Sequence, residues 1–233
     1  SGEWRNIQAG DVISYEPGRN LHIFGHAAEQ LSERIKEQLQ TGHSAPHHFN
    51  LPDGRALDVF IEILPPAVHL VLMGHQYDVY PLSRLAKEMD WQVTIAANPH
   101  KLNSQIVALA DLVLAPGDLD KLRTDEYTAI ILMAHDYKTD KYNLLKALGT
   151  TSPYIGMLGP RSRSERLWAE LADEGRPVSP SDHERIYAPV GLDIGAVTPE
   201  EIALSLMAEV KAVLSGREGA SLRYRRSTIH QRD

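Results

Sequence analysis

Apolar and polar positions alternate along most of the chain in a way that predicts buried strands and the helices that cover them. The clearest example is the run His69–Met73, which is almost wholly apolar, ends at Gly74, and is followed by apolar residues at helical spacing over 82–89. A short unbroken apolar run is typical of a strand buried on both faces, and a repeat of three or four residues is typical of a helix. The segment therefore predicts the first strand and helix of a βαβ unit.

The same alternation continues toward the end of the chain. Further strands are predicted at 92–96, 112–114, 128–133 and 154–157, and helices at 83–89, 104–109, 143–148 and 164–171. A last helix begins at a capping box made by Thr198 and Glu201, with Pro199 at its first position. We therefore expect an α/β fold with a Rossmann-like parallel sheet and helices on both of its faces.

The first 66 residues follow a less regular pattern. They carry turn signals at Pro17-Gly18 and Pro52-Asp53-Gly54, one amphipathic helix near 28–39, and a strand at 59–64 that Pro65-Pro66 ends. We predict three parts: a small α+β N-terminal domain over 1–66, a Rossmann-like domain over 67–215, and a basic, flexible tail over 216–233.

Five histidines lie in the first part, and their pattern bears on metal binding. His22 and His26 have the four-residue spacing with which two ligands on one helix share a metal, but Gly25 interrupts the helix. His47 and His48 are adjacent in what reads as a proline-containing loop, so their side chains point apart. Together with His43 they are interpreted as scattered surface histidines, and we expect no metal site.

Composition narrows the classes of function. A formal charge of −7 on 233 residues argues against nucleic-acid binding, because that affinity comes largely from Lys and Arg. The absence of cysteine excludes a disulfide and a thiolate nucleophile. No apolar run approaches the length of a membrane span. We therefore expect a cytoplasmic protein that binds neither nucleic acid nor membrane.

Ligands of open parallel sheets bind beyond the carboxyl ends of the strands, so the first turn is the first candidate site. It reads Gly74-His75-Gln76-Tyr77-Asp78-Val79 and keeps only the first glycine of the G-x-G-x-x-G dinucleotide fingerprint. A side chain at Gln76 would obstruct the close approach of a pyrophosphate. The second strand is followed by Ala96-Ala97-Asn98, where a dinucleotide enzyme has an acidic residue for the ribose. The scaffold thus favours a nucleotide-like ligand, but the residues do not favour nicotinamide dinucleotides.

Two polar candidates lie in the turns before later helices. His135-Asp136 follows the fourth strand and is either an acid–base pair or, for Asp136, the cap of the next helix. Gly191 and Asp193 lie in a glycine-flanked loop before the last helix. That loop is either brought against the ligand or is a plain structural turn.

The turn after the fifth strand carries glycines and cations. Gly156 and Gly159 are followed by Arg161 and Arg163 near a helix start. Backbone N–H groups and guanidinium groups both favour phosphate at such a position, so the turn is a candidate anion site. The alternative is a solvated helix face.

These stretches together resemble the xanthine dehydrogenase accessory factor family (XdhC/CoxI). The longest match to the family's APIGLDIGAxTPEEIAxSIxAE is Ala188-Pro189-Val190-Gly191-Leu192-Asp193-Ile194-Gly195-Ala196, then Thr198-Pro199-Glu200-Glu201-Ile202-Ala203 and Ala208-Glu209. His135-Asp136 with Asp140 resembles the family's THDH segment and following Asp, and Tyr154–Gly159 with two arginines resembles YIGMIGSRRKR. The similarity covers about 59–211. The chain departs from the family at Gln76, Ala134 and Pro160, and it lacks a cysteine found in many members' first domain.

The resemblance implies an accessory protein, in a homodimer, that acts as a chaperone and carrier rather than as an enzyme with turnover. It would bind molybdenum cofactor, as molybdopterin or molybdopterin dinucleotide, and hand it to a xanthine dehydrogenase-like molybdenum hydroxylase. The residues expected to bind the cofactor are Gly74, His75, Gln76, His135, Asp136, Gly156, Gly159, Arg161, Arg163, Gly191 and Asp193, and none is expected to be catalytic. Two alternatives stay open: an NAD(P)-dependent oxidoreductase, and a non-catalytic interaction module whose nucleotide pocket has decayed.

Overall fold

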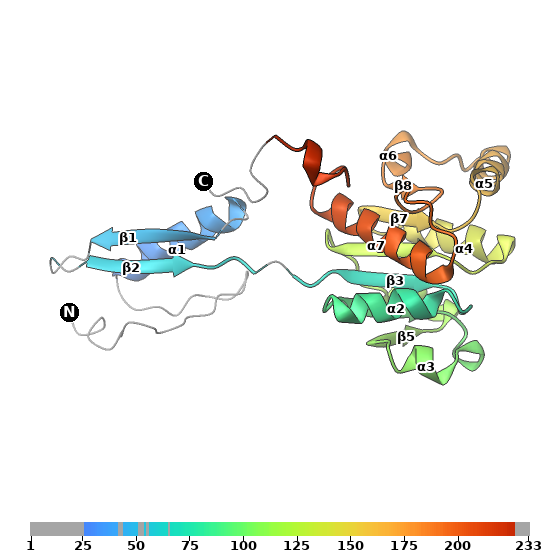
Figure 1. The fold of residues 1–233 in the computed structure, drawn as a ribbon, viewed down its shortest axis with the longest axis horizontal. Helices are drawn as coiled ribbons and strands as arrows, with labels where there is room; N and C mark the ends of the chain where they lie inside the picture. Colours follow the sequence, from blue (N-terminus) through green and yellow to red (C-terminus); the bar gives the residue numbers. More distant parts are fainter. Residues whose placement is uncertain (1–25, 42–43, 51–53, 55, 65, 227–233) are drawn as a thin grey trace. The chain divides into compact units, whose positions relative to one another are not determined.

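The computed structural model describes the chain except residues 1–25, 42–43, 51–53, 55, 65 and 227–233 (Figure 1). Its contacts divide the chain into two units, Ser1–Pro66 and Ala67–Asp233. The turn predicted at Pro17-Gly18, most of the one at Pro52-Asp53-Gly54, and the side chains of His22, His26 and His43 lie outside the described residues. None of the helices in the described part combines the length and apolar composition that a membrane span requires.

In its described residues, the first unit has one helix and a two-stranded antiparallel sheet (Figure 1). The helix α1 spans His26–Thr41, and β1 (Ala45–Asn50) pairs with β2 (Ala56–Ile61). The strand predicted at 59–64 thus begins and ends earlier. The loop predicted around His47 and His48 is wrong, because both lie in β1.

The two histidines still point apart, since side chains alternate along a strand. His47 Nε2 lies 2.9 Å from Gln38 Oε1 on α1, and His48 Nδ1 lies 2.6 Å from Asp58 Oδ1 on β2. Within the described part of the chain, no three His, Asp or Glu side chains are placed to share a metal ion. Each of these two histidines thus contacts a neighbouring element of the first unit.

The second unit is a parallel six-stranded sheet, which confirms the Rossmann-like α/β prediction. The strand order is β5-β4-β3-β6-β7-β8. The order reverses between β3 and β6, the topological switch point at which ligands of such sheets bind. The strands are β3 (His69–Met73), β4 (Gln92–Ala96), β5 (Leu112–Leu114), β6 (Thr128–Leu132), β7 (Tyr154–Met157) and β8 (Ile186–Tyr187). Only β8, with two residues, was not predicted.

Helices cover both faces of this sheet (Figure 1). Because side chains alternate along a strand, Leu70 and Leu72 pack under α2, α3 and α7, whereas Val71 and Met73 pack under α4 and α5. The bounds of the helices are α2 (Val79–Glu88), α3 (Ser104–Val107), α4 (Tyr137–Leu148), α5 (Arg161–Asp173), α6 (Pro180–His183) and α7 (Pro199–Leu214), with 3-10 turns η2 (Pro99–Lys101), η3 (Pro116–Lys121) and η4 (Leu222–Tyr224). The capping box predicted at Thr198 and Glu201 is present. The turn η4 lies within the segment predicted to be a flexible tail.

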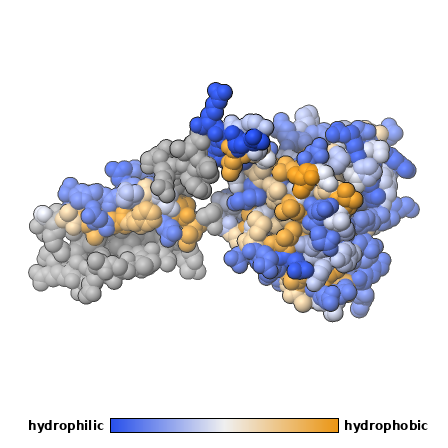
Figure 2. Space-filling view, viewed as in Figure 1, coloured by the Kyte–Doolittle hydropathy of each residue, from blue (hydrophilic) through white to orange (hydrophobic). Residues whose placement is uncertain are grey.

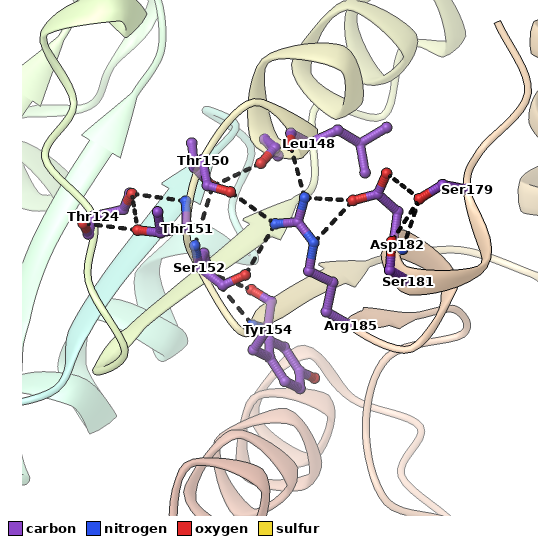
Figure 3. Close-up of polar contacts among 11 residues, drawn as sticks. Thr124, Leu148, Thr150, Thr151, Ser152, Tyr154, Ser179, Ser181, Asp182 and Arg185 are labelled. Carbon is purple, nitrogen blue, oxygen red and sulfur yellow. Dashed lines mark hydrogen bonds and ion pairs between the residues drawn. The ribbon is translucent and has the colours of Figure 1, made fainter.

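Arg185 fixes the short strand β8 at its amino end (Figure 3). Its guanidinium donates to the carbonyl oxygens of Leu148, Thr150 and Ser152, at 2.7, 3.0 and 3.1 Å, and to Asp182 Oδ1 at 2.6 Å. These contacts join the end of α4 to the segment that enters β7. Arg185 thus acts at the end of the sheet opposite to the carboxyl ends of the strands, where ligands of such sheets bind.

Candidate functional site

The turn between β3 and α2, residues 74–78, is built differently from a phosphate-binding loop. Gly74 is required by packing, because a Cβ there would lie 2.3 Å from the Met133 carbonyl oxygen at the end of β6. The N–H groups of Val79 and Tyr80 donate to the carbonyl oxygens of Gln76 and Tyr77. The first amides of α2 are therefore already engaged. His75 is half-buried and Gln76 is exposed, so neither side chain fills the core beneath the turn.

His135 pairs with Asp78, across the switch point, and not with its neighbour Asp136. His135 Nε2 lies 2.5 Å from Asp78 Oδ2. The Asp78 side chain is 16% exposed and that of His135 is 49% exposed. The prediction that His135 pairs with the adjacent Asp136 is thus wrong. The carboxylate that pairs with His135 comes from the turn after β3, 57 residues earlier.

Asp136 is the cap of α4, the alternative that the sequence left open. Its Oδ2 accepts hydrogen bonds from the backbone N–H and the hydroxyl of Thr139, at 2.8 and 2.6 Å. The bonds from Thr139 lower the pKa of Asp136 below its ordinary value. An ionised cap at this end also interacts favourably with the helix dipole.

Asp140 connects the turn after β6 to the helix after β7. Its carboxylate is buried, accepts from the backbone N–H of Ala134 at 3.0 Å, and pairs with Arg163 Nη2 at 2.5 Å. Burial raises the pKa of Asp140, and the two bonds oppose that rise. Arg163 is therefore held in place by a buried partner rather than being free in solvent.

The turn between β7 and α5, residues 158–160, comes directly before Arg161 and Arg163 in the first turn of α5. Gly159 has φ of +122°, Pro160 is the N-cap of α5, and no acidic residue lies in the first turn of the helix. Among the described residues, no acidic side chain pairs with the exposed Arg161. A shallow hollow here is lined by Met157, Leu158, Gly159, Pro160, Arg163, Ser164 and Ala188. An exposed guanidinium and the amino end of a helix lie together here, and both favour an anion.

The loop 188–197 is fastened to α7 and packs on the end of β7. The Glu209 carboxylate of α7 accepts from the Gly191 N–H at 2.8 Å and from the Tyr154 hydroxyl. Ser205 of α7 donates to the Leu192 carbonyl oxygen at 2.6 Å. Gly191 has φ of +103°, and a Cβ there would lie 2.5 Å from Ser205 Oγ. Gly191 is thus a packing glycine.

Gly156 has a similar role on the other side of the same loop. A Cβ on Gly156 would lie 2.7 Å from Val190 Cγ2, and the Val190 N–H donates to the Met157 carbonyl oxygen. The loop therefore sits directly on β7. Asp193 lies beyond this contact with an exposed side chain.

The structure brings the sequence-predicted residues into two groups around the carboxyl ends of the strands. His135 belongs with the switch-point turn, whereas Gly159, Arg161 and Arg163 belong with the β7–α5 turn. Residues that the sequence did not assign to the site hold these groups in place: Asp78, Asp140, Ser205 and Glu209. Asp140 and Glu209 lie in the family motifs quoted above, and those motifs could have indicated a role for them. Asp78 lies in the first candidate turn, but nothing in the sequence indicated that its partner would be His135, 57 residues later.

Comparison with known proteins gives consistent matches. The family model of the XdhC Rossmann domain matches residues 70–210, more than half of the chain. The chain is 29% identical over 208 residues to a probable xanthine dehydrogenase subunit from Bacillus subtilis, covering 85% of this chain and 58% of that protein. It is 27% identical over 173 residues to the uncharacterized protein YqeB of Escherichia coli, covering 71% of this chain and 31% of that protein.

One solved structure extends this comparison to the fold. A xanthine dehydrogenase from Bacillus halodurans matches with a TM-score of 0.58 at 22% identity, over 86% of this chain and 71% of that chain. At this identity the likeness shows the fold alone. The chain spans less than two thirds of the length of both curated relatives above.

Proposed function

Because the chain belongs to the XdhC family, we propose that it is an accessory protein that binds molybdenum cofactor and delivers it to a xanthine dehydrogenase-like hydroxylase. The observation that carries this proposal is the extent of the family match, which spans the six-stranded sheet and every turn at its carboxyl end. One sequence relative named above is a probable xanthine dehydrogenase subunit. By the family resemblance we also propose a cytoplasmic homodimer, organised as the three parts expected from the sequence.

We assign the phosphate of the cofactor to the β7–α5 turn. Arg161, which pairs with no acidic side chain among the described residues, supplies a positive charge there. Gly159 has a positive φ, and the amino end of α5 lies at the same place. A phosphate gains both from guanidinium hydrogen bonds and from a helix N-terminus. The buried Asp140 keeps Arg163 beside the hollow, so this second cation is already oriented before the cargo arrives.

The geometry disfavours the oxidoreductase alternative. A nicotinamide dinucleotide would place its pyrophosphate at the start of α2, where the first amides have acceptors and the Asp78 carboxylate adds a negative charge. After β4 the residues Ala96 and Ala97 are buried, and Asn98 uses its side chain to accept from the His100 N–H. No acidic side chain follows this strand to bind a ribose.

The interaction-module alternative has a specific observation in its favour. The face of the second unit seen in Figure 2 carries apolar patches among hydrophilic residues. Large apolar side chains are exposed in and next to the loop 188–197, including Ile194, Val197 and Leu204, with Val197 at 81%. We propose that this segment contacts the hydroxylase, which is compatible with cofactor delivery.

The test is to purify the protein from cells that make molybdenum cofactor, oxidise it, and measure pterin fluorescence. We expect pterin in the wild-type protein and a strong reduction in Arg161→Gln. Arg166→Gln is the matched control, because Arg166 lies on the same helix but stacks on the Tyr137 ring at 4.8 Å. Wild-type protein without pterin, and unable to take up added cofactor, would contradict the proposal. An equal reduction in both variants would contradict the assignment of the phosphate.

A further inference from the structure

The Asp78–His135 pair joins the two strands at which the sheet changes direction. Asp78 follows β3 and His135 follows β6, and these strands are neighbours in the sheet. Ligands of doubly wound sheets lie at this place. A fixed imidazole here is therefore positioned beside any molecule that enters.

The pairing determines which ring nitrogen carries hydrogen. An ionised carboxylate only accepts hydrogen bonds, so His135 Nε2 must be the donor across the 2.5 Å contact with Asp78 Oδ2. In the neutral imidazole, Nδ1 then holds the lone pair. Nδ1 makes no hydrogen bond with any residue that the structure describes, and the side chain is half-exposed.

The backbone of His135 is held in an unusual conformation, which a role of its imidazole in ligand binding would explain. Its φ is +59°, in the left-handed region, which is sterically unfavourable for a residue other than glycine. The residues on both sides are pinned: Ala134 donates its N–H to Asp140, and Asp136 caps α4. Strain that is maintained by surrounding contacts is frequent at functional sites.

We propose that Asp78 is a positioning residue that fixes His135 as the Nε2–H tautomer, so that Nδ1 accepts a hydrogen bond from an N–H group of the bound ligand. The ligand part rests on the function proposed above, since the pyrimidine ring of a pterin offers N–H donors. Phosphate and pterin ring would then be recognised at different turns, by Arg161 after β7 and by His135 after β6. Asp78 itself is mostly buried, and its Oδ1 has no partner among the described residues.

The tautomer is tested without any ligand. In nitrogen-15 NMR spectra of the whole chain, His135 should show a protonated Nε2 and an unprotonated Nδ1, with its signals assigned by their loss in His135→Gln. Asp78→Ala should shift His135 to a mixture of tautomers while the spectra of other histidines stay unchanged. A protonated Nδ1 in the neutral wild-type imidazole would overturn the proposal.

The ligand contact is tested with the cofactor retained by protein from cells that make it. Asn places its side-chain oxygen near the Nδ1 position and tolerates a positive φ, whereas Gln reaches the Nε2 position. His135→Asn should therefore retain more pterin than His135→Gln. The loss of one hydrogen bond predicts about a 3- to 10-fold decrease in affinity for pterin in the His135→Gln and Asp78→Ala variants. Thermal unfolding checks that all variants fold, and His100→Asn is the surface control.

The outcomes separate the two proposals. Better retention by His135→Gln than by His135→Asn would overturn the Nδ1 contact. Wild-type protein that shows the expected tautomer but carries no pterin would overturn the proposed function and the ligand assignment together, while the positioning by Asp78 would stand. Retention in Asp78→Ala equal to wild type would overturn the link between Asp78 and the ligand.

Discussion

Replacing Glu209 by Ala tests whether α7 holds the loop 188–197 through one carboxylate. Glu209 Oε2 accepts from the Gly191 N–H at 2.8 Å and from the hydroxyl of Tyr154, which is fully buried. The substitution leaves both donors without an acceptor. An unsatisfied buried donor costs about 1–3 kcal/mol, and a partly buried one such as the Gly191 N–H costs less, so we expect a loss of about 2–5 kcal/mol in the free energy of unfolding. For a protein of this size that lowers Tm by roughly 4–20 °C.

The assay is urea or thermal unfolding followed by circular dichroism, with Glu126→Ala as the control because Glu126 is exposed. Tyr154→Phe removes one of the two donors, so Glu209→Ala should cost less in the Tyr154→Phe background than in the wild type. Residues that share one network are non-additive in this way. Full additivity of the two substitutions, or a loss no larger than that of the control, would refute the reasoning.

Two further predictions concern stability, beside the tests of Arg161 and Asp78 given above. Arg185→Ala should lower the free energy of unfolding by about 3 kcal/mol, because three carbonyl oxygens lose a charged donor. Arg185→Lys should restore only part of that stability, since one ammonium group does not reproduce the guanidinium fork. Equal stability of Arg185→Lys and the wild type in urea would contradict this prediction. The second prediction concerns pH. Burial and then the bond to Glu209 raise the pKa of Tyr154 above its ordinary value. The folded state therefore keeps this proton more tightly than the unfolded state, and the contribution is complete below about pH 10 and declines as pH rises above it. Urea unfolding at increasing alkaline pH should show a shallower decline for Tyr154→Phe than for the wild type, and identical slopes would exclude Tyr154 as the cause.

The fold of the second unit was predictable because its signals are local. An apolar run such as His69–Met73 can only be buried on both faces, and a capping box such as that at Thr198 marks a helix start by itself. Short elements were not predicted, because they do not carry such a local pattern. β8 has two residues, too few for a pattern, and it exists because β7 and Arg185 hold it. β1 was misread because Pro46 suggests a loop, but pairing with β2 overrides that local preference.

The position of the candidate residues beside the carboxyl ends of the strands was predictable, but their contacts were not. The rule that ligands bind at strand ends selected the turns that contain His135 and Arg163. Their pairing with Asp78 and Asp140 was not predictable, because a hydrogen bond between turns is fixed by how the strands are ordered in the sheet. The glycines Gly74, Gly156 and Gly191 stay predicted cofactor-binding positions, and the structure adds that each makes a close contact with a neighbouring segment.

The class of fold, the family and the arginines after β7 can be read from the amino-acid sequence, since periodicity, caps and motif residues act over a few positions of the chain. Which carboxylate pairs with which imidazole or guanidinium depends on the folded arrangement. It brings Asp78 to His135, and Glu209 to Gly191 and Tyr154, by placing β3 beside β6 and α7 against the end of β7. Such pairings depend on distances in space between residues that are remote along the chain, and no local pattern contains that information.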